Sequence, residues 1–213
     1  MSLRGIDDDL QTALNLPSSQ GALVQDVTPG SPGDRLGLRP YDIILAFDGV
    51  TVESDDDLIR NIAGHAPGST AQLQVLRDGR EFSVAVKLAE RPTRQAARQP
   101  SAAGPPENSR RDTDGGLLGL TVRDLDAATF NRYALPSTTR GVLIAAVEVM
   151  SPLFDADVQR GTVLLEVNRT PVTSVAAYNR IAQTFRAGDV LTLFVYTPES
   201  SQRQVKTVRI DAQ

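Results

Sequence analysis

Short runs of apolar residues, separated by glycine, proline and aspartate, recur along the chain. Runs of this kind, bounded by turn residues, are typical of β-strands. In the first half we therefore expect strands over residues 21–27, 42–47, 71–77 and 80–88. Asp48-Gly49 and Asp78-Gly79 each follow a predicted strand and indicate two-residue hairpin turns.

One segment of the first half has apolar residues at helical spacing. Ser54 is a residue type favoured at helix N-caps, and residues 55–57 are aspartates that would oppose the positive end of the helix dipole. The apolar stripe consists of Leu58, Ile59, Ile62 and Ala63. We predict a helix that begins after Ser54 and ends before Pro67-Gly68, and a shorter helical turn ending at Leu38.

The second half repeats the first. Residues about 120 positions apart match without a gap, so that Gly21-Ala22-Leu23-Val24 corresponds to Gly141-Val142-Leu143-Ile144. We accordingly expect strands over 141–149, 162–167, 190–196 and 204–210, and a helix from Ser174 to Phe185. Each copy has roughly 90 to 100 residues, which is enough to bury a core of its own.

Short strands with two helices per copy predict an α+β fold that is mainly β. We expect two partly open β-barrels, each capped by two helices, with domains at residues 3–90 and 116–213. Residues 91–115 contain proline, alanine, arginine and serine but almost no large apolar side chain. This composition predicts a linker, with a docking strip for an acidic surface as the alternative for its arginines.

Composition excludes several classes of function. The formal net charge of -4 provides no basic surface for nucleic acid, and no apolar run approaches the roughly 18 residues of a membrane span. The chain has no cysteine and a single histidine, His65, so we expect neither a cofactor nor a metal cage. Residues 7–9 and 55–57 are consecutive aspartates, which point in different directions and lack the spacing of a calcium loop. His65 is expected at a helix C-terminus, where it suits the dipole.

A series of short motifs in the first copy points to a known family. They are Gly37-Leu38-Arg39-Pro40-Tyr41-Asp42-Ile43-Ile44, Asp48-Gly49, a helix from Ser54, Pro67-Gly68 and Leu76-Arg77-Asp78-Gly79. In this order they resemble a bacterial PDZ domain, and specifically the first PDZ domain of the HtrA/Deg periplasmic serine endoproteases. The second copy resembles the second PDZ domain of that family.

The second copy departs from the pattern at two positions, where Thr162 replaces Asp42 and Asp157 replaces Gly37. In the first copy Tyr41 stands where the family usually has glycine, and Gly161 restores the glycine in the second copy.

The resemblance implies that each copy binds extended peptides, usually C-termini, by adding them as a strand at a sheet edge. In the second copy the implied carboxylate loop, edge strand and groove helix comprise Leu117, Leu118, Gly119, Leu120, Thr121, Val122, Arg123, Val175, Tyr178, Asn179 and Ala182. In the first copy the implied edge strand and helix comprise Leu3, Arg4, Gly5, Ile6, Asp55, Leu58, Ile59 and Ile62. The leucines and isoleucines among them could equally be ordinary core.

Aligning Leu16-Pro17 with Leu135-Pro136 places Leu3 on Val122, so the counterpart of Gly119 would lie before Met1. We expect that the chain was cut from a longer protein inside its first PDZ domain, and that the truncated loop weakens peptide binding there.

The resemblance further implies a non-catalytic region of a periplasmic endoprotease that acts in protein quality control. Its partners would be C-termini or extended segments of unfolded proteins, an upstream trypsin-like protease domain and an oligomer formed through that domain. The chain has no Gly-Asn-Ser-Gly-Gly nucleophile loop, and the lone His65 does not make a triad. The alternatives are a PDZ scaffold or secretion-system component without a protease domain, and the PDZ insert of a membrane-embedded site-2-type protease.

Overall fold

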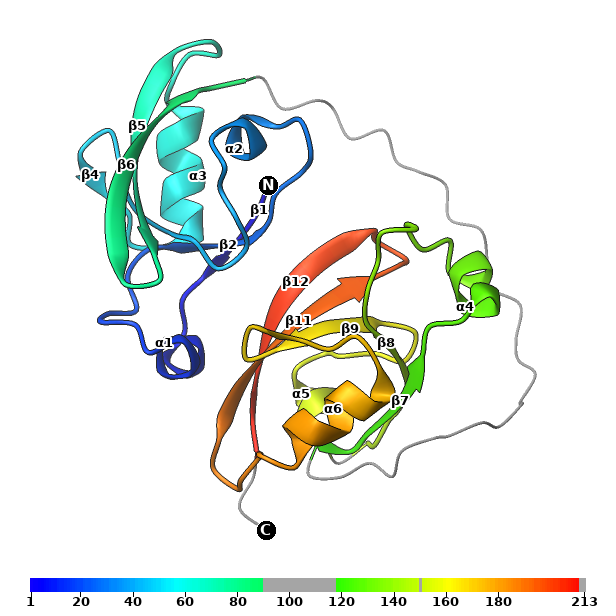
Figure 1. Cartoon of the computed structure of the whole chain (residues 1–213). Helices are drawn as coiled ribbons and strands as arrows, with labels where there is room; N and C mark the ends of the chain where they lie inside the picture. The colour runs from blue at the N-terminus through cyan, green and yellow to red at the C-terminus, as the bar shows by residue number, and fades with distance from the viewer. Residues whose placement is uncertain (90–117, 150, 211–213) are drawn as a thin grey trace. The chain divides into compact units, whose positions relative to one another are not determined.

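The computed structural model describes residues 1–89, 118–149 and 151–210, and the chain divides into two compact units, Met1–Ala96 and Ala97–Gln213 (Figure 1). We call them unit 1 and unit 2. The predicted linker, residues 91–115, lies outside the described residues. The predicted domain limits therefore stay predictions.

Unit 1 is an open antiparallel sheet with three short helices among its described residues. Its elements are β1 (Ser2–Gly5), α1 (Asp8–Leu14), β2 (Ala22–Asp26), α2 (Pro32–Arg35), β3 (Ile43–Phe47), β4 (Val50–Thr51), α3 (Asp55–Ala63), β5 (Thr70–Arg77) and β6 (Arg80–Lys87). The strands are ordered β1-β2-β3-β5-β6, and the short β4 pairs with β3. The sheet does not close on itself, which leaves β1 at one edge.

Unit 2 repeats this order of elements. They are β7 (Leu120–Asp124), α4 (Ala127–Arg132), β8 (Val142–Val147), α5 (Pro152–Asp155), β9 (Val163–Val167), β10 (Thr170–Pro171), α6 (Val175–Ala182), β11 (Val190–Thr197) and β12 (Gln202–Arg209). The strands are ordered β12-β11-β9-β8-β7, with β10 beside β9. The mainly β fold of both copies is thus confirmed.

The registers of the two edge strands agree. Leu3 pairs with Val24 and Val122 pairs with Ile144, and in each strand a register shift immediately precedes the pair. Val24 and Ile144 are counterparts in the repeat, so the predicted alignment of Leu3 with Val122 is confirmed.

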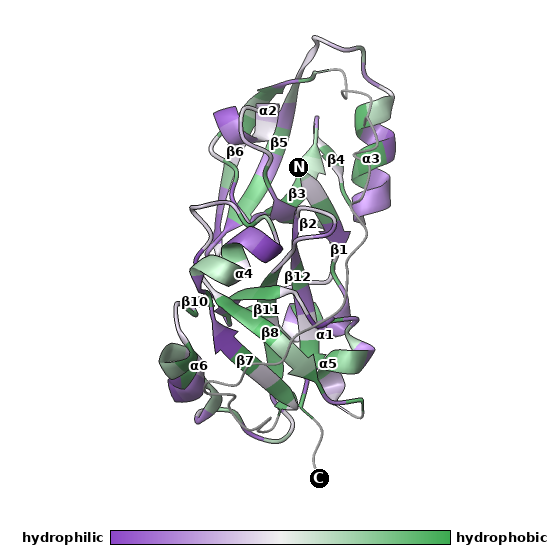
Figure 2. Ribbon diagram, turned by 90° about the vertical axis from the view of Figure 1, so that its right-hand side faces the viewer, coloured by the Kyte–Doolittle hydropathy of each residue, from purple (hydrophilic) through white to green (hydrophobic). Residues whose placement is uncertain are grey.

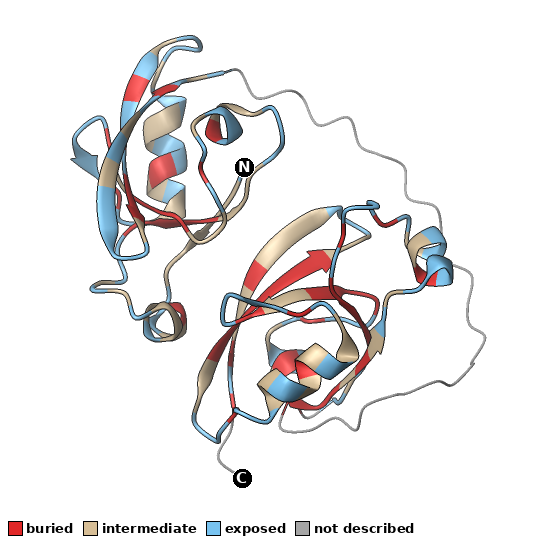
Figure 3. Ribbon diagram, viewed as in Figure 1, coloured by how far each residue is buried: buried red, intermediate tan, exposed pale blue. Residues whose placement is uncertain are grey.

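Each unit has one main core between its sheet and its longest helix. Buried residues concentrate in the central strands and at the middle of α3 and α6 (Figure 3). β5 alternates exposed and buried residues, whereas β11 is buried on both faces and is largely hydrophobic (Figure 2). In unit 2 the second face of the sheet packs in a smaller cluster with residues from around α4: Leu135, Leu143, Val163 and Tyr196, with Phe130 and Tyr133 against them.

The two hairpin predictions are confirmed. Asp48-Gly49 joins β3 to β4, Asp78-Gly79 joins β5 to β6, and all four residues have positive φ, from 48° to 80°. Type I′ turns require this conformation, and aspartate and glycine are among the residues that adopt it at least cost.

The predicted number of helices was too low, because each unit has three rather than two among its described residues. α1 and α4 were missed because helices of seven and six residues have fewer than two turns in which a period can show. Both begin at an aspartate cap: Asp7 accepts a hydrogen bond from Leu10 N and Asp126 one from Thr129 N, each 2.7 Å long. α6 ends at Ala182, three residues before the predicted Phe185.

Candidate peptide-binding site

An edge strand lies beside the longest helix in each unit. β7 pairs with β8 on one side and contacts α6, and β1 pairs with β2 and contacts α3. Among the described residues no further strand pairs with the outer side of β7 or β1. The unpaired backbone of such an edge can accept an extended chain as an additional strand.

In unit 2 a side chain of the edge strand holds the groove helix. Asp124, the last residue of β7, accepts a hydrogen bond of 2.7 Å at Oδ1 from the backbone N–H of Val175, the first residue of α6. Ser174 caps the same helix through a 3.1 Å bond from Ala177 N to its hydroxyl oxygen. The start of α6 is therefore fixed to the end of β7.

The face of α6 toward the groove is defined by burial. Val175, Asn179 and Ala182 are half-buried and stand at a spacing that places them on one face of the helix. Tyr178 is only 3% exposed and belongs to the main core, and burial raises its pKa to about 12. Tyr178 therefore packs under the helix, and its predicted contact with a peptide stays a prediction.

The predicted carboxylate loop enters β7 through Gly119, while Leu117 lies outside the described residues. Gly119 has φ +59°, and a Cβ atom at this position would lie 2.6 Å from Cβ of Ser151. Only glycine fits this backbone without strain or collision. The carbonyl of Gly119 accepts a 2.9 Å hydrogen bond from Glu148 N, which ties the loop to the residue after β8.

The apolar residues around this loop are buried in the structure. Leu118, Leu120 and Val122 are all in the main core of unit 2. Thr121 lies between Leu120 and Val122 on the half-exposed side of β7, and the predicted role of all four residues in a groove stays a prediction.

In unit 1 the corresponding end of the groove is built differently. Gly5 is the counterpart of Asp124, and Asp55 is the counterpart of Val175. A Cβ atom at Gly5 would lie 3.1 Å from Asp55 Oδ1. The carboxylate at this end therefore comes from the helix in unit 1 and from the strand in unit 2.

The remaining predicted residues of unit 1 are divided between groove and core. Ile62 packs at the edge of the main core, and Ile59 is 50% exposed. Leu58 has no exposed surface and lies in the core, and its predicted contact with a peptide stays a prediction. Arg4 forms an ion pair with Asp7.

Ile6 lies beyond the last residue of β1. Its predicted place in the edge strand is therefore corrected.

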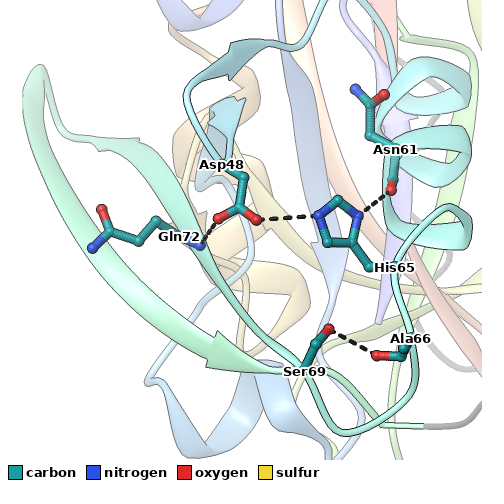
Figure 4. Close-up of polar contacts among 6 residues, drawn as sticks. All are labelled: Asp48, Asn61, His65, Ala66, Ser69 and Gln72. Carbon is teal, nitrogen blue, oxygen red and sulfur yellow. Dashed lines mark hydrogen bonds and ion pairs between the residues drawn. The ribbon is translucent and has the colours of Figure 1, made fainter.

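The single histidine lies near an aspartate and a serine, but the three do not form a triad. His65 Nε2 lies 3.1 Å from Asp48 Oδ2 and its Nδ1 lies 2.9 Å from the carbonyl oxygen of Asn61 (Figure 4). The hydroxyl of Ser69 donates to the carbonyl of Ala66 at 2.7 Å. The predicted helix C-terminal position of His65 is confirmed, since its backbone N–H donates to Ile62 O.

Two other kinds of site are absent from the described residues. Nowhere in that part of the chain do three or more histidine, cysteine or acidic side chains gather where a metal ion would fit. Of the helices that the structure describes, none is both long and apolar enough to span a bilayer.

Comparison with known proteins agrees with this architecture. Residues 4–88 match the PDZ domain family. The chain is 32% identical over 191 residues to the "Probable periplasmic serine endoprotease DegP-like" of Chlamydia trachomatis serovar D, covering 90% of this chain and 35% of that protein. It is 29% identical over 195 residues to the protein of the same name from Hahella chejuensis, covering 91% of this chain and 39% of that one.

Among solved structures, the HtrA-type protease AlgW with decapeptide is 26% identical and has a TM-score of 0.41, covering 44% of this chain and 29% of that chain. The chain spans 35% and 39% of the lengths of the Chlamydia and Hahella proteins, respectively. Residues 4–88 are a PDZ domain, and the chain is homologous to the PDZ region of the HtrA/DegP-type serine endoproteases.

Proposed function

We propose that this chain is the non-catalytic peptide-binding region of a periplasmic HtrA/Deg-like serine endoprotease. It captures C-termini or extended segments of unfolded proteins and presents them to a trypsin-like protease domain elsewhere in the full-length protein, which also assembles the oligomer. The names of the relatives support the protease and its location.

One observation carries the peptide-binding part of this proposal. β7 is an edge strand that directly follows Gly119, and it runs beside a helix to which Asp124 fastens it. An added strand would gain backbone hydrogen bonds from β7, while its terminal carboxylate would accept hydrogen bonds from N–H groups of the loop at Gly119.

The grooves favour peptides that end in an apolar residue. Leu118, Leu120 and Val122 line the floor in unit 2, and Val175 and Ala182 line its wall. Because a short peptide loses much conformational entropy when it is ordered, we expect micromolar affinity, near -8 kcal/mol.

The proposal is tested by calorimetric titration of the chain with a ten-residue peptide that ends in valine. The peptide is used once as the free acid and once as its C-terminal amide. We expect the free acid to bind and the amide to bind at least tenfold more weakly. Equal binding of both would replace C-terminal recognition by recognition of internal segments, and absence of binding would refute peptide capture.

The non-catalytic part of the proposal has its own test. The chain alone should leave denatured casein intact during an overnight incubation. Cleavage that a covalent serine-protease inhibitor abolishes would show that this chain carries a catalytic site.

A further inference from the structure

The strongest feature outside the grooves is the pair of His65 and Asp48 in unit 1. The pair connects the end of α3, the wall of the groove, to the sheet (Figure 4). Asp48 is itself fastened to β5, because its Oδ1 accepts from Gln72 N at 2.6 Å and its N–H donates to Gln72 O at 2.8 Å. His65 packs edge-on against the ring of Phe47, with 4.9 Å between the ring centroids.

Both ring nitrogens of His65 face groups that only accept hydrogen bonds. Nδ1 faces the carbonyl oxygen of Asn61 and Nε2 faces the carboxylate of Asp48. A neutral imidazole has one N–H and makes one of these bonds, whereas the imidazolium has two and makes both. The bond to Asn61 O, within the end of α3, and the bond to Asp48 are therefore present together only in the imidazolium.

Unit 2 has the same architecture without a titrating pair. Asn168 corresponds to Asp48 and binds Thr192 on β11 in the same way, with 2.8 Å from Asn168 N to Thr192 O and 2.9 Å from Thr192 N to Asn168 Oδ1. Phe185 corresponds to His65 and is buried in the main core. The repeat thus contains its own comparison, in which an apolar ring replaces the imidazole.

Among the charged side chains of the surrounding elements, one carboxylate lies against the imidazole. On α3 the nearest charged side chain in sequence is Arg60, which forms an ion pair with Asp57 at 3.6 Å. β5 has no charged side chain before Arg77, which binds Asp42. On β6, Lys87 pairs in register with Thr70. Asp48 is thus the charged group in hydrogen-bonding contact with His65.

We propose that proton uptake by His65 strengthens the attachment of the end of α3 to the sheet and thereby makes the groove of unit 1, but not that of unit 2, sensitive to pH. The inference rests on the proposed peptide binding for its functional consequence. Ile62, one turn before His65 and a predicted groove residue, is partly buried against the main core. A helix held in place needs less ordering when a ligand binds, so binding tightens as pH falls.

The sign follows from the number of bonds that each form makes. The protonated ring gains one charge-assisted bond in the folded state, so the stabilisation is present at low pH and is lost as pH rises through the range in which histidine releases its proton. The side chains of both partners are 36% exposed, so the effect is modest.

The first experiment needs no ligand. Amide hydrogen exchange of the whole chain is followed by NMR at pH 5.5 and 7.5 and corrected for the intrinsic exchange rates. The amides of Gly64 and His65, which donate to Arg60 O and Ile62 O, report on unit 1. Those of Thr184 and Phe185, which donate to Ile181 O and Ala182 O, report on unit 2. We expect protection in unit 1 to be two- to fivefold higher at pH 5.5, as for about one exposed ion pair, with no change in unit 2.

Asp48→Asn is the matched variant, since Asn168 shows that an asparagine keeps both bonds to the neighbouring strand. The side-chain amide of this asparagine can donate to Nε2 of the neutral ring, so both bonds of the ring form without proton uptake. The higher amide protection of unit 1 at pH 5.5 should therefore disappear. His65→Phe, which copies Phe185, should do the same. Equal pH dependence in wild type and Asp48→Asn would overturn the inference, as would a wild type without pH dependence.

The second experiment measures the affinity of the valine-terminated free-acid peptide at the two pH values, with shifts of the β1 and β7 amides read separately. We expect about two- to fivefold tighter binding at pH 5.5 in unit 1 of the wild type and no change in unit 1 of Asp48→Asn. If the peptide binds neither unit, the proposed function fails while the exchange result still decides the proton-dependent contact. Binding with the same pH dependence in both proteins would refute regulation by His65.

Discussion

The guanidinium of Arg77 holds the buried carboxylate of Asp42 through two parallel hydrogen bonds. Nε lies 2.6 Å from Oδ1, and Nη2 lies 2.6 Å from Oδ2 and 2.8 Å from the carbonyl oxygen of Gly37. The hydrogen bond with Asp42 raises the pKa of Arg77 above its ordinary value, outweighing the effect of burial. The Asp42 side chain is 1% exposed and also accepts from Arg39 N, so the pair ties the turn before β3 to the end of β5.

Arg77→Ala should destabilise unit 1 by about 3–5 kcal/mol, because it leaves a buried carboxylate without its counter-charge. Urea unfolding followed by NMR signals of unit 1 measures the change. The double variant Asp42→Thr/Arg77→Thr copies Thr162 and Thr197 of unit 2 and should be more stable than Arg77→Ala. This account would be contradicted if the double variant lost as much unfolding free energy as the two single variants, Asp42→Thr and Arg77→Thr, lose together.

Gly119→Ala should weaken peptide binding by unit 2 at least tenfold and cost about 1–3 kcal/mol of stability, because the backbone has positive φ and the new Cβ meets Ser151. Gly188→Ala is the control, since Gly188 has φ +89° with no atom within 4 Å of a Cβ. It should lose stability through backbone strain while keeping peptide affinity. Calorimetric titration of both variants separates the loop's role from general strain, and unchanged binding by Gly119→Ala would remove the loop from the site.

Asp124→Ala and Asp126→Ala remove two carboxylates that each accept a 2.7 Å bond from a helix amide. We expect each to cost roughly 1 kcal/mol in thermal unfolding of unit 2. Only Asp124 joins the edge strand to the groove helix, so only its loss should weaken peptide binding, by about threefold. Equal peptide affinities of the two variants would show that the hydrogen bond between Asp124 and Val175 does not affect the groove.

Unit 2 should lose stability above pH 10 because of Tyr178. Burial raises the pKa of Tyr178 to about 12, so the unfolded chain releases this proton first and unfolding becomes easier as pH rises from about 10 to 12. The loss reaches at most about 3 kcal/mol. Tyr178→Phe should abolish this part of the alkaline loss, as measured by urea unfolding at pH 9 and 11. The same loss in Tyr178→Phe would assign it to other groups.

Local signals in the sequence determined the duplication, the strands and the turns. Asp48-Gly49 and Asp78-Gly79 specify hairpins because their backbone preferences act within two residues, and Ser54 and Ser174 cap helices through bonds to residues three positions later. The repeat also predicted the pairing position of Leu3, since Val122 occupies the same register in the second copy.

Only the tertiary structure decided which side chains of the two long helices enter the core. α3 and α6 each carry apolar residues on more than one face, so the sequence did not show that Leu58 and Tyr178 turn into the core while Ile59 and Asn179 remain outside. That choice depends on how the helix packs against the sheet. The meeting of His65 with Asp48 has the same origin, because residues 17 positions apart come together only when α3 is laid across β3 and β5. Contacts between distant segments are fixed by packing of the whole sheet, which no local pattern encodes.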